Sequence, residues 1–132
     1  MGNTAWYKHG LVYVVDVRTF MDADGDGIGD LPGLCRKLDY LAELGVTAMC
    51  LLPLQPSPGQ SGGFDLLDLG SIAPSVGQWR SFRNLLHEAA RRRIFVILDL
   101  VVGYTSDQHP WFQRARRAAA GSARRARWNQ GC

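Results

Sequence analysis

The 132-residue sequence has few cysteines and no long hydrophobic run, and both absences exclude classes of protein. Its three cysteines are an odd number without a Cys-x-x-Cys pair, which argues against a disulfide framework and favours free thiols in a reducing compartment. No stretch approaches the roughly 18 apolar residues of a membrane span. The start of the chain lacks the charged, apolar and cleavage regions of a secretory signal. We therefore expect a cytoplasmic protein without a membrane partner.

Acidic residues are missing from the last part of the chain. Residues 1–107 contain nine Lys or Arg and twelve Asp or Glu, a formal charge of −3. Residues 108–132 contain six Arg and no acid, so the overall charge of +3 is a property of this last segment. A basic run can attract phosphate backbones, but no nucleic-acid-binding motif accompanies it. We expect no nucleic-acid partner.

Three short apolar runs, rich in β-branched residues, are typical of strands that are buried on both faces. The predicted strands are residues 11–17, 46–52 and 94–102. They alternate with two helical patterns, one between Pro32 and Gly45 and one over residues 78–93. This alternation implies right-handed crossovers and a parallel sheet, so the predicted fold class is α/β.

Three strands do not complete a sheet of this class. A (β/α)₈ barrel typically needs about 250 residues, and an open doubly wound domain usually has about five strands. The hydrophobic content of 46% permits a core, but two apolar sheet edges would stay open. We therefore expect at most one domain, and an incomplete one.

The loop at residues 22–30 is the strongest functional signal in the sequence. It places carboxylates at alternate positions and glycines where the backbone must turn sharply. Ca²⁺ takes about six to eight oxygen ligands, which carboxylates and a backbone carbonyl supply. The predicted ligands are the side chains of Asp22, Asp24, Asp26 and Asp30 and the carbonyl oxygen of Ile28. The twelfth position of an EF-hand would fall on Gly33 rather than Glu, so no EF-hand follows; the alternative is a loop that binds no ion.

Several motifs follow one another in a recognisable order between residues 6 and 121. They are Trp6-Tyr7-Lys8, the acidic loop at 22–30, Leu38-Asp39-Tyr40-Leu41, Leu44-Gly45-Val46-Thr47-Ala48, Leu51-Leu52-Pro53 with Pro56-Ser57-Pro58, and the stretch Thr-Ser-Asp-Gln-His-Pro-Trp-Phe at 105–112. Together they resemble the start of an α-amylase superfamily enzyme (glycoside hydrolase family thirteen). The pattern is most similar to trehalose synthases, with oligo-1,6-glucosidases and related α-glucosidases close behind.

The resemblance implies a partial (β/α)₈ barrel. Its first three strands and two helices would occupy residues 1–105, and the start of an inserted domain after strand three, with a helix at 109–120, would occupy residues 106–121. The family pattern stops there. Residues 122–132 form an off-pattern basic tail whose Arg and Ala are typical of GC-rich codons read in another frame.

The resemblance also implies retaining chemistry, in which an Asp nucleophile and a Glu acid/base lie about 5–5.5 Å apart. In the family these carboxylates and a stabilising Asp follow strands four, five and seven, which this chain does not contain. No catalytic residue is therefore assigned, and we expect the chain to be inactive alone. Two alternatives stay open: a stand-alone module that binds a divalent metal or a sugar, and half of a split barrel completed by another chain.

Two segments correspond to substrate-binding segments of the family, and both depart from its pattern. Phe64-Asp65 replaces Tyr-Asp and so keeps the ring and the carboxylate without the hydroxyl. Gly103-Tyr104 replaces Asn-His and so loses the imidazole. The resemblance implies that Phe64, Asp65 and Tyr104 contact an α-glucoside such as maltose or trehalose, more weakly than in the family. The alternative is that Phe64 and Tyr104 are only packing residues.

Two other segments match the family without such a departure. The 22–30 loop matches the family's metal loop at each ligand position, so Ca²⁺ is the expected cofactor, with Mg²⁺ as the alternative. His109 lies in the Ser-Asp-Gln-His-Pro-Trp stretch, which implies a scaffolding role at the start of the inserted domain.

Overall fold

The computed structural model describes residues 5–59, 62–118 and 121. The chain divides into two compact units, one of residues 1–54 and 72–99, and one of residues 55–71 and 100–132. The basic tail predicted over 122–132 lies outside the described residues. The domain boundaries expected after residues 105 and 121 stay a prediction.

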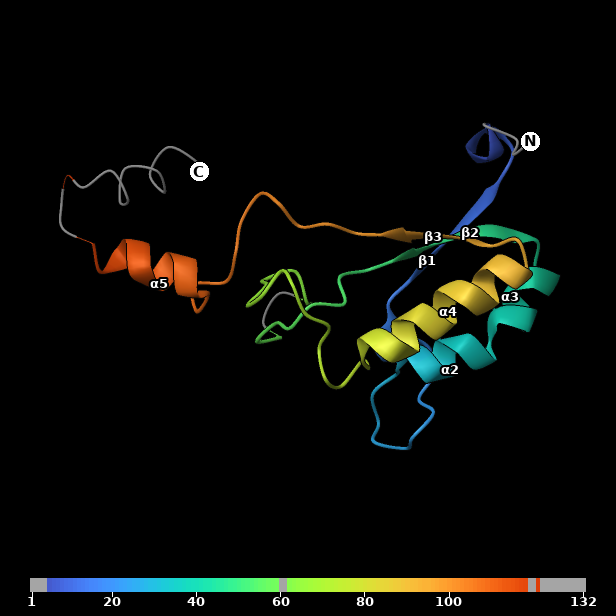
Figure 1. Ribbon diagram of the computed structural model, residues 1–132, viewed down its shortest axis with the longest axis horizontal. Coiled ribbons are helices and arrows are strands. Elements are labelled where there is room, and N and C mark those ends of the chain that lie inside the picture. Colours follow the sequence, from blue (N-terminus) through green and yellow to red (C-terminus); the bar gives the residue numbers. More distant parts are fainter. Residues whose placement is uncertain (1–4, 60–61, 119–120, 122–132) are drawn as a thin grey trace. The chain divides into compact units, whose positions relative to one another are not determined.

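The first unit is a three-stranded parallel sheet with helices on one face (Figure 1). Its strands are β1 (Leu11–Val15), β2 (Val46–Leu51) and β3 (Phe95–Leu98), which lie side by side in that order. Its helical segments are η1 (Trp6–Lys8), α1 (Val17–Phe20), α2 (Leu31–Arg36), α3 (Leu38–Glu43) and α4 (Trp79–Arg91). The strand order and the parallel pairing confirm the predicted α/β class.

The core of the first unit lies between the sheet and its helices. Met49 and Leu51 of the central strand are fully buried, and they belong to one hydrophobic cluster with Leu34 of α2 and Leu85 of α4. Successive residues of a strand point to opposite faces, so Met49 and Leu51 mark the face that the helices cover. Truncating such a buried leucine to alanine typically costs about 2–5 kcal/mol.

The predicted first helix is two short helices. The backbone at Lys37 has φ −98° and ψ 3°, and its amide donates to the carbonyl oxygen of Leu34, which closes one tight turn between α2 and α3. Helix α3 ends at Glu43, and Gly45 lies just past this end as predicted, with a φ of +80° that suits glycine. The connection between β1 and β2 therefore has the predicted apolar helical face, but a tight turn divides it into α2 and α3.

Burial on both faces was predicted for all three strands, and this is wrong for the outer two. On the face opposite to Met49 and Leu51, Val14 of β1 is 61% exposed and Ile97 of β3 is 37% exposed. Among the described residues of this unit, no α-helix covers the face that points away from α2, α3 and α4, and the short η1 reaches it only at Phe95, through Trp6. The strands are also shorter than predicted, because Asp16 leaves β1 to cap α1 and β3 ends at Leu98.

The second unit contains the loop 55–71 and the segment that follows Asp99. Its one helix among the described residues is α5 (Pro110–Arg116), which begins where the helix at 109–120 was expected. The carbonyl oxygen of Leu66, a fully buried residue, accepts a hydrogen bond from the Ser106 amide (3.1 Å). In the described part of the chain, no helix is long and apolar enough to cross a membrane.

Arg92, the residue after α4, connects that helix to α3. Its guanidinium donates to Asp39 through Nε (2.6 Å) and Nη2 (3.1 Å), and to Glu88 through Nη1 (2.7 Å). The hydrogen bonds from Arg92 hold the pKa of Asp39 and the pKa of Glu88 below their usual ranges. The two carboxylates in turn raise the pKa of Arg92.

The Arg92 network predicts a pH-dependent contribution to stability. Both carboxyl pKa values are lowered in the folded chain, so this contribution is present above the unfolded-state values of about 4 and is lost as the pH falls through the lowered values. We expect Arg92→Gln to raise the pKa of Asp39 and Glu88 toward their ordinary values, measured by NMR titration of the carboxyl carbons. At a pH low enough to protonate both carboxyl groups, the thermal stability of the variant should approach that of the parent chain.

Arg91→Gln is the matched control, because the Arg91 side chain is 67% exposed and the ion pair that the described residues show for it is with Glu88, not Asp39. It should change the pKa of Asp39 much less than Arg92→Gln does. An unchanged Asp39 pKa in Arg92→Gln would contradict the assignment of Arg92 as the connection between α3 and α4.

Candidate metal centre

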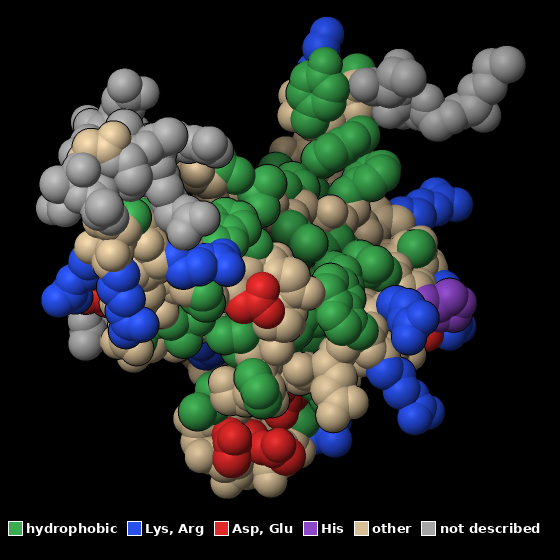
Figure 2. Space-filling model, turned by 60° about the vertical axis from the view of Figure 1, so that its left-hand side comes forward, with side chains coloured by type: hydrophobic (Ala, Val, Ile, Leu, Met, Phe, Trp, Pro, Cys, Tyr) green, Lys and Arg blue, Asp and Glu red, His purple; other side chains and the backbone are tan. Residues whose placement is uncertain are grey.

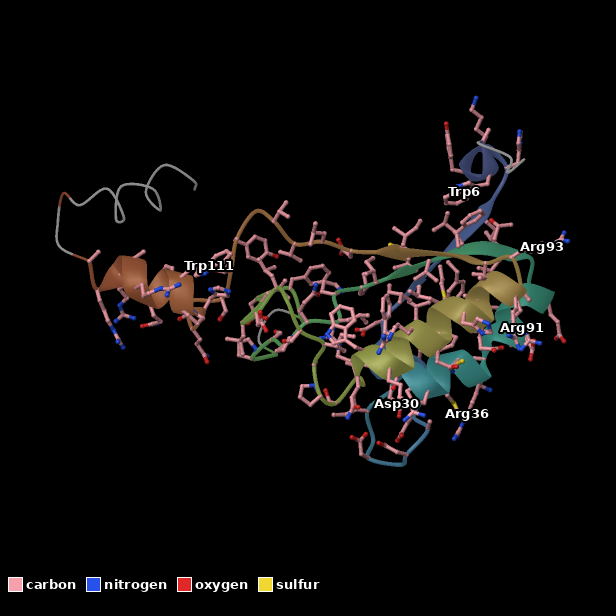
Figure 3. All side chains as sticks on the ribbon, viewed as in Figure 1. Trp6, Asp30, Arg36, Arg91, Arg93 and Trp111 are labelled. Atoms are coloured by element: carbon pink, nitrogen blue, oxygen red, sulfur yellow. The ribbon has the colours of Figure 1, made fainter. Side chains whose placement is uncertain are left out.

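The acidic loop joins α1 to α2, and its carboxylates form a red cluster at the surface (Figures 1 and 2). Asp30 lies at the base of the loop, where α2 begins (Figure 3). This residue is only 5% exposed: its Oδ1 accepts from the Gly33 amide (2.6 Å) and caps α2, and its Oδ2 accepts from the Ala23 amide (3.2 Å). Asp30 therefore anchors both the loop and the helix.

The glycines of the loop orient amides toward Asp22. Gly25 and Gly27 have φ of +86° and +89°, a region that favours glycine. Their amides donate to the Asp22 carboxylate at 2.7 and 2.8 Å, and the Asp24 amide donates at 3.1 Å. The bonds from Gly25 and Gly27 hold the pKa of Asp22 below its usual range, so its carboxylate is anionic at neutral pH.

The carboxylates of three predicted ligands converge. Ligand oxygens of Asp22, Asp24 and Asp30 all lie within 4.8 Å of one another. Two oxygens bound to one Ca²⁺ at about 2.4 Å can be at most about 4.8 Å apart, so this spacing fits one such ion. The cluster does not include Asp26, whose Oδ1 accepts from the Ile28 amide (2.7 Å). The roles of Asp26 and of the Ile28 carbonyl stay predictions.

Both ends of the loop are fastened to neighbouring elements. The Gly29 amide donates to the carbonyl oxygen of Arg18 (2.7 Å), and the Asp30 amide donates to that of Met21 (3.0 Å). Arg36 of α2 donates from Nη1 to the carbonyl oxygen of Ala23 (3.4 Å). The base of the loop is therefore held by hydrogen bonds to α1, to Met21 and to α2, while its tip is exposed.

An ion pair at the carboxyl end of β1 was not part of the predicted site. Asp16 caps α1 by accepting from the Arg18 amide, and the same oxygen accepts from Arg18 Nε, both at 3.1 Å. The carboxyl end of β3 lies at the same edge of the parallel sheet, where the Asp99 amide donates to the carbonyl oxygen of Leu51 (2.9 Å). An Asp that ends an apolar run is the sequence signal for such a cap.

The predicted substrate residues all lie in the second unit. Phe64 and Asp65 are half-buried in the loop 55–71, where the Ser57 hydroxyl donates to the Asp65 carboxylate. Tyr104 lies beyond β3 and is 56% exposed, which argues against a core packing role. The hydrogen bond between Ser106 and Leu66 connects the two segments. Their assignment to sugar binding stays a prediction.

His109 is buried, with 4% of its surface exposed, and it caps α5. Its Nδ1 accepts from the Trp111 amide (3.0 Å), and the two rings meet edge to face with centroids 4.8 Å apart. These contacts agree with the scaffolding role that was expected for His109.

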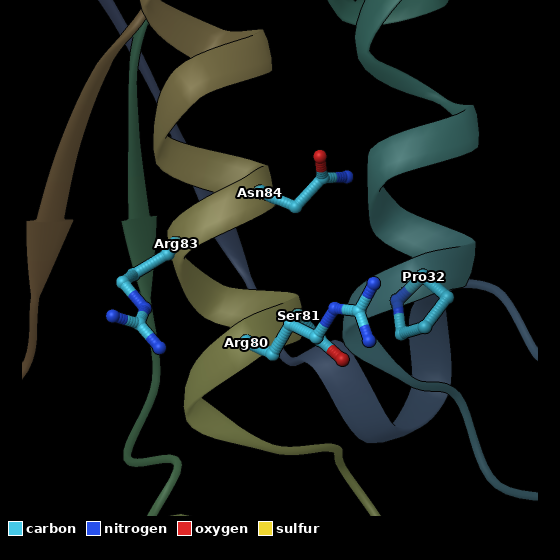
Figure 4. Close-up of a pocket in the computed structure, with 5 residues that line it drawn as sticks. All are labelled: Pro32, Arg80, Ser81, Arg83 and Asn84. Atoms are coloured by element: carbon cyan, nitrogen blue, oxygen red, sulfur yellow. The ribbon is translucent and has the colours of Figure 1, made fainter.

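A hollow of about 540 Å³ lies between α2 and α4, away from the acidic loop's ligands (Figure 4). It is lined by Pro32, Arg80, Ser81, Arg83 and Asn84. Figure 4 shows the Arg80 guanidinium directed toward Pro32 and the Arg83 guanidinium directed away from it. Because the two cations diverge, the hollow lacks the convergent donors that an anion site requires.

Comparison with known proteins agrees with the parallel sheet and its helices. The family model for the α-amylase catalytic domain matches residues 15–129. The trehalose synthase/amylase TreS of Mycolicibacterium smegmatis is 48% identical over 114 residues, which are 86% of this chain and 19% of that protein. A glucan 1,6-α-glucosidase of Streptococcus pneumoniae is 47% identical over 110 residues, 83% of this chain and 21% of that protein.

Solved structures of similar proteins have the same fold over most of this chain. The trehalulose synthase MutB of Pseudomonas mesoacidophila MX-45 superimposes with a TM-score of 0.85 at 36% identity, over 94% of this chain and 22% of that one. The isomaltulose synthase PalI of Klebsiella sp. LX3 gives a TM-score of 0.86 at 35% identity, again over 94% and 22%.

This chain belongs to the α-amylase catalytic domain family. The parallel sheet with its helices corresponds to the N-terminal part of the family's (β/α)₈ barrel, as the resemblance predicted. The chain spans about a fifth of the length of the curated relatives that it matches, 19% and 21% of the two named above.

The loop geometry predicts unequal effects for two of its aspartates. Asp22→Ala removes the acceptor of three backbone amides, whereas Asp26→Ala removes the acceptor of the Ile28 amide alone. A single lost hydrogen bond typically changes an opening equilibrium by about two- to tenfold. We expect amide hydrogen exchange at Gly25 and Gly27 to accelerate by this factor in Asp22→Ala and to change little in Asp26→Ala. Equal acceleration in both variants would contradict the central role of Asp22.

Proposed function

We propose that this chain supplies the opening strands of an α-amylase-family enzyme that acts on α-glucosidic bonds, and that its own chemical contribution is a Ca²⁺-binding loop. The observation that carries the proposal is the convergence of the Asp22, Asp24 and Asp30 carboxylates within 4.8 Å. Family membership and the order of motifs place this loop in the first connection of the barrel.

The donor set favours Ca²⁺ over other divalent ions. All predicted ligand atoms are oxygens, as hard cations require, and Asp26 with the Ile28 carbonyl would complete the set. The loop is irregular and its tip is exposed, which suits the flexible coordination of Ca²⁺ better than the near-octahedral shell of Mg²⁺. A bound Ca²⁺ would neutralise the like charges of the three carboxylates and so fix the loop against α2.

The substrate class follows from the relatives. They include a trehalose synthase and a 1,6-α-glucosidase, and a trehalulose synthase variant was solved with sucrose. We assign the whole enzyme an α-glucoside such as maltose or trehalose, with trehalose-synthase-like chemistry as the specific form. Phe64 and Asp65 would contact the sugar, and the exposed Tyr104 hydroxyl would donate one hydrogen bond to it.

A stand-alone module that binds a divalent metal is the second candidate function. The acidic loop and every described contact that holds it belong to the first unit. Cation binding therefore needs no residue outside that unit. We place either form in the cytoplasm, a location supported by the free thiols of Cys35 and Cys50.

The metal proposal predicts that Asp24→Asn weakens Ca²⁺ binding. The asparagine Oδ1 keeps the acceptor for the Asp26 amide (3.2 Å) but removes one negative charge from the ligand set. We expect the dissociation constant, measured by isothermal titration calorimetry, to rise at least about tenfold, since ligand charge sets affinity in oxygen sites. Mg²⁺ should bind more weakly than Ca²⁺ to the parent chain.

Glu43→Gln is the matched control, because it makes the same charge change on an exposed residue of α3, outside the loop. It should leave the affinity unchanged. Equal affinities in the parent chain and Asp24→Asn, or no detectable binding by the parent chain, would refute the metal site.

The proposal also predicts that the 132-residue chain does not hydrolyse or isomerise maltose by itself. No residue of this sequence matches a catalytic carboxylate of the family, and chemistry of this kind needs two carboxylates across the bond. Purified chain incubated with maltose should release glucose and form trehalose no faster than a mock preparation from cells without the gene. Heat-sensitive turnover that follows the chain through two different columns would disprove this.

A further inference from the structure

Helix α5 has an apolar inner side and a basic outer side. Its inner side consists of Phe112, which is half-buried, and Ala115, which is 3% exposed. Its outer side carries Trp111, which is 51% exposed, and the exposed Arg114 and Arg117. Arg117 follows the helix and keeps a helical backbone, with φ −82° and ψ −7°. Residues three positions apart are neighbours on a helix surface, so these outer side chains form one row, which we call the basic stripe.

The arginines of this helix are exposed and are not neutralised. None of Arg114, Arg116 and Arg117 forms an ion pair with a carboxylate of the described residues. Arg92 of the first unit, in contrast, has two carboxylate partners. From residue 108 to residue 132 the sequence has six Arg and no Asp or Glu. The basic stripe therefore belongs to a segment whose positive charge no acidic residue of the same segment balances.

Trp111 is held in position from inside its own unit (Figure 3). Its amide donates to Nδ1 of the buried His109 (3.0 Å), and the two rings meet edge to face. About half of the tryptophan surface nevertheless stays exposed. An exposed aromatic ring on a fixed backbone, beside positive side chains, is the arrangement on which unpaired bases stack.

We propose that the basic stripe binds single-stranded nucleic acid, with Arg114 and Arg117 on backbone phosphates and Trp111 against a base. Arginine suits this role because its planar fork of donors matches the geometry of phosphate oxygens. Stacking accepts every base, so the binding has little sequence preference. The inference is independent of the proposed enzyme function, because no residue of the stripe belongs to the acidic loop or to the predicted sugar contacts.

The expectation of no nucleic-acid partner rested on the absence of a recognition motif. Binding to a single strand without sequence preference requires only a positive surface and a stacking aromatic ring, and the helix register supplies both. This combination is seen only when the residues are placed on the helix.

An anionic membrane fits the basic stripe less well than a nucleic acid does. A helix that binds at a lipid surface inserts a broad apolar face. In α5 the apolar side chains Phe112 and Ala115 lie on the inner side instead. Among the described residues of this helix, Trp111 alone is a large apolar side chain that is exposed. Phosphate groups with stacked bases therefore match the stripe better than a bilayer.

The test is a titration of a dye-labelled oligothymidylate of about 20 nucleotides with the full chain, followed by fluorescence anisotropy at several salt concentrations. The double variant Arg114→Gln with Arg117→Gln removes two phosphate contacts. At about 50 mM salt its affinity should fall at least about tenfold. The plot of log affinity against log salt should become less steep by about 1.4, because each contact with a single strand contributes about 0.7.

The double variant Arg80→Gln with Arg83→Gln is the matched control. It removes the same charge from two exposed arginines of α4, in the first unit. Its affinity and salt dependence should stay close to those of the parent chain. Circular dichroism of each variant shows whether the helix content is retained.

Trp111→Ala tests the stacking contact separately. We expect the affinity to fall about five- to a hundredfold, the usual effect of removing one stacking ring. Trp111→Phe should restore most of this loss, because the smaller ring still stacks. Trp79→Ala is the control, since Trp79 is 55% exposed on α4, and it should bind as the parent chain does.

The inference is overturned if the parent chain does not bind the oligonucleotide at the lowest salt concentration. It is also overturned if the α5 arginine variant binds as well as the α4 arginine variant, or if Trp111→Ala binds as well as Trp79→Ala. Tighter binding to vesicles of phosphatidylserine and phosphatidylcholine than to the oligonucleotide would assign the stripe to a membrane surface instead. None of these results bears on Ca²⁺ binding by the acidic loop, so the two proposals fail separately.

Discussion

The parallel pairing of β2 with both neighbours is the constraint on which the rest of this chain depends. Parallel strands cannot be joined by tight turns, so each connection must cross back over a face of the sheet. Here the crossovers bring Leu34 and Leu85 over Met49 and Leu51, and all four side chains are fully buried. Because the strands are parallel, their carboxyl ends meet at one edge. Because both crossovers use the same face, no α-helix of the described residues covers the opposite face of this sheet.

The acidic loop is part of the first of these crossovers and takes its stability from it. Its base is fixed by backbone bonds to Arg18 of α1 and to Met21, the residue after α1. At the tip, Gly25 and Gly27 supply the turns, and their amides donate to the Asp22 carboxylate. A functional loop on a rigid scaffold is the usual arrangement in proteins of this class.

The sequence patterns predicted those features that interactions between residues close in the sequence control. Hydrophobic periodicity gave the strand order and the helical faces, and the spacing of the aspartates indicated the loop. The exposure of Val14 and Ile97 was missed, because an apolar strand carries the same pattern whether one or both of its faces are covered. The spacing of the aspartates does not separate Asp24, which joins the cluster, from Asp26, which does not, because their positions depend on backbone angles at Gly25 and Gly27 that no pattern records.

The several contacts of the Asp30 carboxylate have a consequence for the stability of the first crossover. One of its oxygens caps α2, the other holds the Ala23 amide, and the same carboxylate belongs to the cluster of ligand atoms. In the proposed metal site, helix initiation and ion capture would therefore be linked through one side chain. By mass action, an ion at one hundred times its dissociation constant adds about 2.7 kcal/mol to the free energy of unfolding. The first crossover would thus sense the cation concentration of its surroundings, and a chelator would act on it as a denaturant.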